Sequence, residues 1–224
     1  ATQVDSRREF GDAVRNLLNQ LGNRDVTVET DTEVTAADVA GESWDKIVIA
    51  TGATEKQPEL AGPDVHRSWD VLQGESVGDS AVVFDNNKHA AGVGVAEYLV
   101  DADRDVTFVT TSYHPGDQLE GTNVPPFLET LYENDVDIVT HTTVIGFEDN
   151  AAQLLNVYSE EMTTVEADSL VVAARREART GLAESIREQG VDGDAVHRIG
   201  DCVAPRLIDK AIYDGEMLAR ELSV

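Results

Sequence analysis

The sequence has one cysteine, no long apolar run and no closely spaced histidine pair, and each absence excludes a class of protein or site. Cys202 is the only cysteine among 224 residues, so neither an internal disulfide nor a four-cysteine iron–sulfur or zinc site can form within this chain. No stretch approaches the ~18 apolar residues that a membrane-spanning helix needs, and no signal-peptide pattern opens the chain. The five histidines show no i, i+4 pairing, so we assign no metal site.

Acidic residues dominate the charge. The chain carries 43 Asp and Glu against 17 Lys and Arg, which gives a formal net charge of -26. No basic stripe is available to neutralise phosphates, and this argues against nucleic acid and anionic membranes as partners. Hydrophobic residues still make up 41%, so we expect a folded protein whose self-repulsion is screened by salt. These features predict the cytoplasmic protein of a halophile.

The end of the last expected strand carries a first sign of a ligand site. The strand stops at Gly200, and Asp201 follows at once. Pro205 stands where the first turn of a helix running to residue 222 would accept a residue without an N–H. Such a corner brings an acceptor side chain to the positive end of a helix dipole, where the polar part of a nucleotide or flavin can bind. On this segment alone, a surface turn in which Asp201 only caps the helix is an equal alternative.

A second candidate follows the near-continuous apolar run 46–50, which has the length of a buried parallel strand. The run ends in the small residues Ala50, Thr51 and Gly52. Small residues at the carboxyl end of a strand let an adenine or ribose lie against the backbone. The alternative is a plain tight turn.

Cys202 and the arginine cluster are expected to have structural rather than chemical roles. Cys202 has apolar neighbours and is expected to be a small buried side chain rather than a redox group. Arg175, Arg176 and Arg179 form the one basic cluster, and we expect them to make solvated ion pairs with the acidic surface.

Hydrophobic periodicity predicts an alternation of helices and strands. An amphipathic helix is expected over 6–21, and residues 54–78 are expected to cross between lobes. Residues 81–110 predict a βαβ unit. Helices are expected over 90–100 and 125–133, and strands over 26–28, 46–50, 81–84, 106–110, 143–147, 153–158, 163–166 and 168–174.

An internal repeat relates two parts of the chain. Residues 25–28 with 45–51 resemble residues 135–139 with 168–174, because in each copy a short strand is followed later by an acid and an apolar strand that ends in small residues. A βαβ unit at 81–110 precedes the second copy, whereas none precedes the first. We therefore expect two related lobes, the first of which lacks a unit that an N-terminal neighbour would supply.

The turn after the strand at 81–84 lacks the glycines of a dinucleotide site. It reads DNNKHAAGVG at residues 85–94, so G-x-G-x-x-G is absent at its proper place. Gly92 and Gly94 fall inside the next helix, where close packing against the sheet explains them. The following strand ends in neither an acid for a ribose nor an arginine for a 2′-phosphate. These observations argue against NAD(P) binding by this lobe.

Four segments of the chain resemble the C-terminal region of the NADH:flavin oxidoreductase family. Members of this family include trimethylamine, dimethylamine and histamine dehydrogenases and bacterial 2,4-dienoyl-CoA reductase. The segments are 48–53, 85–89 with 96–99, 106–110, and 199–206 with 211–215. They occur in the family's order over nearly the whole chain.

The resemblance implies an α/β fold of two glutathione-reductase-like, Rossmann-type lobes. Residues 1–76 would be the first part of an FAD- or ADP-type lobe, residues 77–181 an inserted NAD(P)-like lobe, and residues 182–224 the closing part of the first lobe. The FAD or ADP site would be lined by Ala50, Thr51, Gly52, Gly200 and Asp201. FMN, a four-iron four-sulfur cluster and the substrate site would belong to an N-terminal TIM barrel of the parent protein.

The resemblance also implies a function. We expect the C-terminal nucleotide-binding region of a flavin- and iron–sulfur-dependent oxidoreductase, nearer the amine dehydrogenases, with no catalytic residue in this chain. An electron-transfer flavoprotein is a candidate acceptor, and the parent is expected to be a homo-oligomer. One alternative is a non-catalytic ADP-binding or assembly module. The other is the FAD/NADPH part of an enzyme similar to 2,4-dienoyl-CoA reductase.

Overall fold

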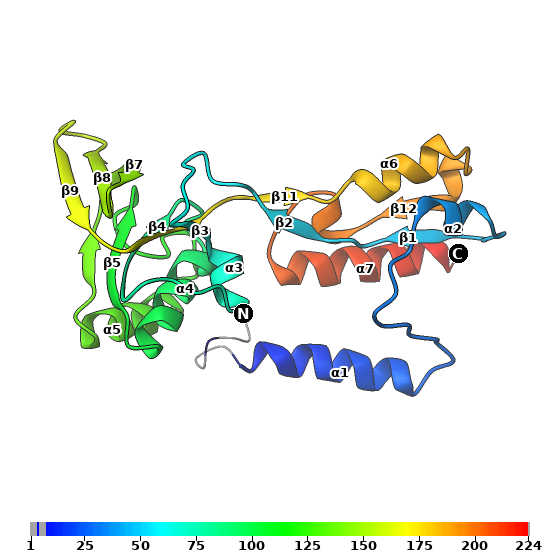
Figure 1. Cartoon of the computed structure of the whole chain (residues 1–224). Coiled ribbons are helices and arrows are strands. Elements are labelled where there is room, and N and C mark those ends of the chain that lie inside the picture. The colour runs from blue at the N-terminus through cyan, green and yellow to red at the C-terminus, as the bar shows by residue number, and fades with distance from the viewer. Residues whose placement is uncertain (1–3, 5–7, 224) are drawn as a thin grey trace. The chain divides into compact units, whose positions relative to one another are not determined.

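The computed structural model describes Val4 and residues 8–223 (Figure 1). The chain divides into two compact units. Unit 1 comprises the chain up to Val26 together with residues 57–175, and unit 2 comprises residues 27–56 and 176–224. Two separate segments therefore build unit 2, and the second part of unit 1 is inserted between them. The α/β class with one interrupted part is confirmed, whereas the lobe boundaries at 76 and 181 stay a prediction.

A parallel sheet forms the centre of unit 1, with its strands in the order β3-β10-β4-β5-β6. The strands are β3 (Val65–Arg67), β4 (Ser80–Asp85), β5 (Asp105–Thr110), β6 (Asp137–Val139) and β10 (Ser169–Ala173). In β10 every residue is buried, and Leu170 lies between Val65 of β3 and Val82 of β4. Burial on both faces explains why β4 and β10 read as continuous apolar runs.

Helices cover one face of this sheet (Figure 1). They are α3 (Ser68–Leu72), α4 (Ala90–Asp101) and α5 (Val124–Glu133). Leu99 of α4 and Leu131 of α5 belong to one buried cluster with Phe108 of β5. The small apolar residues of α4 let this helix lie close to the strands, so most of it is buried.

A three-stranded antiparallel sheet covers the other face. Its strands are β7 (Thr142–Glu148), β8 (Ala151–Asn156) and β9 (Met162–Glu166). Val144 and Leu154 pack in a second buried cluster with Phe84, Val109 and Val172 of the parallel sheet. Unit 1 is therefore a three-layer structure with a core on each face of its sheet.

Unit 2 contains two pairs of short strands. β1 (Ile47–Ile49) is parallel to β12 (Val196–Arg198), and β2 (Ala53–Glu55) is antiparallel to β11 (Arg176–Ala178). Its helices are α2 (Ala36–Ala40), α6 (Gly181–Glu188) and α7 (Ile208–Leu222), with 3₁₀ turns at Gly193–Ala195 and Gly200–Cys202. One small buried cluster joins α2, α6, β1, β12 and the second 3₁₀ turn: Val39, Ile49, Ala183, Ile186, Val196 and Cys202.

The expected N-terminal helix is α1 (Phe10–Gly22), and its predicted start at Ser6 lies outside the described residues. No residue of α1 is buried. Its apolar stripe is exposed by 44–52%: Phe10, Val14, Leu17 and Leu18. Amphipathic spacing correctly predicted a helix here, but the stripe lies on the surface of this chain.

Two expectations about secondary structure are wrong. Residues 26–28 form no strand, because a strand needs a neighbour for its N–H and C=O groups and the structure gives this segment none. Pro205 is not in the first turn of a helix, since α7 begins at Ile208 and its N-cap is Leu207. Residues 203–207 instead connect the 3₁₀ turn to the helix.

Val4 and residues 8–223 contain neither a membrane-spanning helix nor a cluster of metal ligands. No helix there is long and apolar enough to cross a membrane. No group of His, Cys, Asp and Glu there is placed to hold a metal ion.

Candidate nucleotide-binding edge

The pairing of β1 with β12 brings both predicted site segments to one edge of unit 2. The register matches Ile49 with Arg198, so both parallel strands end at the same level. The N–H of Ile199 donates to the carbonyl of Ile49 at 3.1 Å and extends this pairing by one step. Residues 50–52 therefore leave the sheet beside residues 200–201, at the carboxyl edge where open α/β sheets bind ligands.

Two glycines give this edge a backbone that other residues rarely adopt. Gly52 has φ +73°, and a Cβ added there would meet no atom within 4 Å. Gly200 has φ +66°, and its N–H donates to Oδ2 of Asp214 on α7 at 3.1 Å. Positive φ is accessible to glycine without steric cost. Gly200 thus turns the chain and anchors α7, while Gly52 leaves open space in front of the strand end.

Asp201 is held by two partners. Its Oδ2 pairs with Nη1 of Arg176 at 2.7 Å, and its Oδ1 accepts the backbone N–H of Arg206 at 2.9 Å. Arg176 also donates through Nη2 to the carbonyl of Arg206 at 2.8 Å. Asp201 does not cap α7, whose N-cap is Leu207. The carboxylate instead closes the loop that leads from β12 toward the helix.

Arg176 has a different role from the one expected of the basic cluster. The side chains of Arg176 and Asp201 are only 24% and 20% exposed, so their ion pair is partly buried rather than solvated. The pairing joins positions 25 residues apart, one at the start of β11 and one after β12. No local pattern in the sequence could have indicated it.

The segment after β1 is fixed by contacts to residue 179. The hydroxyl of Thr51 donates to the carbonyl of Arg179 at 3.0 Å, and the N–H of Arg179 donates to the carbonyl of Gly52 at 3.0 Å. These bonds continue the β2–β11 ladder to the strand end. Ala50 is exposed beside them and is the smallest side chain that the edge presents.

Cys202 is a small buried side chain, as expected. It is fully buried, and its Sγ lies 3.2 Å from the carbonyl of Ile49 and 3.1 Å from that of Ile199. The thiol therefore links the ends of β1 and β12 from within the small core.

The edge fits the polar part of a nucleotide as one wall of a site. Asp201 keeps a fifth of its side chain exposed, and each carboxylate oxygen can accept more than one hydrogen bond. A ribose or ribityl hydroxyl can therefore donate to Asp201 while its ion pair persists. Residues 27–56 and 176–223 contain no glycine-rich strand-to-helix turn, so the wall that would hold phosphates is not among them.

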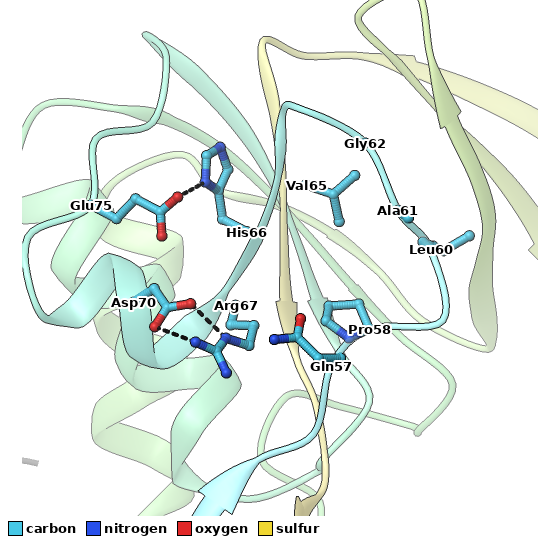
Figure 2. Close-up of a pocket in the computed structure, with 10 residues that line it drawn as sticks. All are labelled: Gln57, Pro58, Leu60, Ala61, Gly62, Val65, His66, Arg67, Asp70 and Glu75. Atoms are coloured by element: carbon cyan, nitrogen blue, oxygen red, sulfur yellow. Dashed lines mark hydrogen bonds and ion pairs between the residues drawn. The ribbon is translucent and has the colours of Figure 1, made fainter.

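A pocket of unit 1 lies beside β3 and encloses about 220 Å³ (Figure 2). Its charged residues already pair with one another. Nδ1 of His66 lies 2.8 Å from Oε1 of Glu75, and Nε of Arg67 lies 2.5 Å from Oδ2 of Asp70. Figure 2 shows both pairs beside the loop that runs through Gly62. Because these charges are satisfied within the chain, we place no ligand in this pocket.

Comparison with known proteins gives a family match over most of the chain. The family described as pyridine nucleotide-disulphide oxidoreductase matches residues 6–215. N,N-dimethylglycine/sarcosine dehydrogenase of Chromohalobacter salexigens is 26% identical over 265 residues, which cover 99% of this chain and 38% of that protein.

Solved structures of related proteins also match this chain over most of its length. Histamine dehydrogenase from Rhizobium sp. 4-9 superposes with a TM-score of 0.92 and 25% identity, over 100% of this chain and 38% of that chain. A 2-naphthoyl-CoA reductase shares the fold, with a TM-score of 0.85 and 24% identity over 96% of this chain and 32% of that one. This chain thus spans between about a third and two fifths of the length of these proteins.

Proposed function

The chain belongs to the pyridine nucleotide-disulphide oxidoreductase family, and we propose that it is the C-terminal nucleotide-binding region of a flavin-dependent amine dehydrogenase. The observation that carries this proposal is the parallel pairing of β1 and β12, which brings Gly52 and Asp201 to one sheet edge. Relatives whose names describe the oxidation of methylated or primary amines support the amine class.

In this proposal unit 2 supplies one wall of an FAD or ADP site. Ala50, Thr51 and Gly52 would lie against the base or ribose, and Asp201 would accept a hydroxyl hydrogen bond. A bound flavin supplies electron transfer. This chain's residues would position the nucleotide: Arg176 holds the Asp201 carboxylate in place, and Gly200 fixes α7 at the same corner. The region alone is expected to be inactive.

The remainder of the parent is part of the same proposal. We place FMN, a four-iron four-sulfur cluster and the substrate site in an N-terminal TIM barrel, because one cysteine cannot hold such a cluster. An electron-transfer flavoprotein is the proposed acceptor, and the parent is proposed to be a homo-oligomer. An upstream coding sequence with a barrel and closely spaced cysteines would support this assignment, and an upstream sequence without them would contradict it.

Binding in the parent protein tests the site. Asp201→Ala is expected to weaken ADP binding about tenfold or more, since a hydrogen bond to a charged group contributes about 1.5–3 kcal/mol. Asp209→Asn is the matched control, because Asp209 lies on α7 with 62% of its side chain exposed. Calorimetry should show a loss with Asp201→Ala alone. Equal affinities in both variants would remove Asp201 from the site, and tight NADPH binding would favour the reductase alternative.

We also propose that the protein works in the concentrated cytoplasm of a halophile. A net charge of -26 on a folded chain raises its free energy in dilute buffer, and salt screens this repulsion. The midpoint of thermal unfolding is expected to rise from millimolar to molar KCl. A midpoint that stays constant or falls would contradict the proposal.

A further inference from the structure

The turn between β4 and α4 contains a carboxylate buried in the fold. Asp85, the last residue of β4, is fully buried. A Cβ at position 92 on α4 would lie 2.6 Å from both Cγ and Oδ1 of Asp85. Glycine at position 92 therefore makes room for the Asp85 side chain. This confirms the close-packing interpretation of Gly92 and names the group against which it packs.

Backbone N–H groups of the turn point at this carboxylate. The N–H of Lys88 donates to Oδ1 of Asp85 at 2.8 Å. The N–H groups of Asn87 and Gly116 also act on the Asp85 carboxylate, and together with Lys88 they favour its charged form. In a strand–turn–helix unit of this kind, N–H groups of the turn are the donors that hold a phosphate. Here an internal acceptor already engages the N–H of Lys88 and attracts its neighbours.

Further bonds keep the turn closed. Nδ2 of Asn87 donates to the carbonyl of Ala174 after β10 at 3.0 Å, and the N–H of Gln118 donates to the carbonyl of Lys88 at 3.0 Å. The turn is thereby fixed to the end of a neighbouring strand and to the loop that follows β5. The backbone N–H of Lys88 therefore already has its acceptor within the chain.

The second carboxylate oxygen is unusual. Oδ2 of Asp85 is buried and has no hydrogen-bond partner. Burial raises the pKa of the Asp85 carboxyl to about 6, against the lowering effect of its three backbone donors. A residue with this desolvation cost is not needed for packing alone, since a neutral side chain would fill the space without it.

We propose that Asp85 is a specificity-determining residue: its carboxylate is a fixed internal anion that takes the N–H donors of the β4–α4 turn and so excludes the phosphates of a dinucleotide from this lobe. The absence of the glycine pattern explains why a nucleotide is not favoured there. Asp85 adds a second reason, because its carboxylate occupies backbone N–H groups that a phosphate would need. The proposal concerns unit 1 alone and does not depend on which nucleotide unit 2 holds.

Amide NMR with inorganic pyrophosphate tests this proposal in molar KCl, where the acidic surface is screened. The variants are Asp85→Gly and Asp85→Ser, which remove the carboxylate. Asp105→Ser is the control, because it removes one negative charge at an exposed position on β5. In both Asp85 variants the amide resonances of Asn87, Lys88 and Gly116 are expected to shift, with an affinity at least about tenfold above that of Asp105→Ser. Folded Asp85 variants that bind no more tightly than the control would overturn the proposal.

The unsubstituted chain supplies a test that needs no variant to fold. Its Asn87, Lys88 and Gly116 amides are expected to move together as Asp85 titrates, because Lys88 bonds to this carboxylate and all three N–H groups favour its charged form. The same amides are expected to stay unmoved when NADH is added. Movement of these amides with NADH, or their failure to move together with pH, would overturn the proposal.

Discussion

Unit 1 and unit 2 bury very different amounts of their apolar surface. The parallel sheet of unit 1 has a buried cluster on each face, whereas unit 2 has one small cluster. α4 of unit 1 is mostly buried, but α7 of unit 2 buries no residue although its apolar residues recur at helical spacing. Sequence pattern therefore shows that a helix has an apolar face, and only packing shows whether this chain covers it.

The exposed apolar side chains of unit 2 indicate the surface against which another part of the protein would pack. On α7 they are Ile208, Ile212, Tyr213, Met217 and Leu222. A groove of about 520 Å³ runs along β12 beside Met217. A pair of short strands is marginal by itself, so β1 and β12 require further packing. The proposed parent would provide it.

The two tryptophans allow the units to be followed separately, because Trp44 belongs to unit 2 and Trp69 to unit 1. In Trp44→Phe the fluorescence reports unit 1, and in Trp69→Phe it reports unit 2. Each prediction below is measured by urea unfolding in molar KCl with the appropriate reporter.

The largest expected effect is in the core of unit 1. Phe108→Ala should lower the free energy of unfolding reported by Trp69 by about 3–5 kcal/mol, because Phe108 is fully buried in the cluster under the helices. Phe10→Ala is the control. The side chain of Phe10 is 44% exposed, and its loss should cost less than about 1 kcal/mol. Similar losses for both would contradict the contrast between a packed core and an exposed stripe.

The next effect is a pH dependence of unit 1. The pKa of Asp85 is about 6 in the folded chain and ordinarily 3.8, so the folded state binds more protons between these values. Its free energy of unfolding should therefore fall by about 3 kcal/mol as pH rises from below 4 to above 6. Asp85→Asn should remove most of this fall. A fall that persists in Asp85→Asn would assign it to other groups.

A smaller effect is expected at the corner of unit 2. Arg176→Ala should lower the free energy of unfolding reported by Trp44 by about 1–2 kcal/mol, because it leaves the partly buried Asp201 with one partner fewer. Arg220→Ala breaks an ion pair whose Arg220 side chain is 72% exposed and should cost less than about 0.5 kcal/mol. Equal losses would mean that the Arg176–Asp201 pair adds nothing beyond a surface contact.

The smallest effect is expected on the apolar face of α7. Ile212→Ala should change the stability of this chain by less than about 0.5 kcal/mol, because Ile212 is 50% exposed. In the proposed parent, where this face is covered, the same substitution should cost about 2 kcal/mol or more. A neutral result in both proteins would mean that nothing covers this face.

Secondary structure was predicted best where elements that follow one another along the chain also pack against one another. β4, α4 and β5 form a local βαβ unit, and their strand runs and helical spacing were interpreted correctly. The strand predicted at residues 26–28 is absent, because a strand needs a neighbouring strand and periodicity does not show whether one is present. The start of α7 was misplaced because Pro205 suits a connecting loop as well as a first turn.

The site was only partly predictable. Small residues after two apolar strands correctly indicated an edge, and the register of β1 and β12 brings the two segments together. The partners of Asp201 and the donors around Asp85 were not foreseen. Arg176 and Asp201 meet through the fold, and Asp85 accepts a backbone N–H group, which residue identity does not mark. Whether the five predicted residues bind a nucleotide stays a prediction.

The contrast between the units is tested most directly by comparing the two reporters in otherwise unchanged chains. Urea unfolding of Trp69→Phe follows Trp44 and unit 2, and unfolding of Trp44→Phe follows Trp69 and unit 1. We predict two separate transitions, with unit 2 unfolding at a lower urea concentration because its core is smaller. Coincident transitions with equal midpoints would show that unit 2 is as stable as unit 1. This result would contradict the proposal that unit 2 needs further packing from the parent protein.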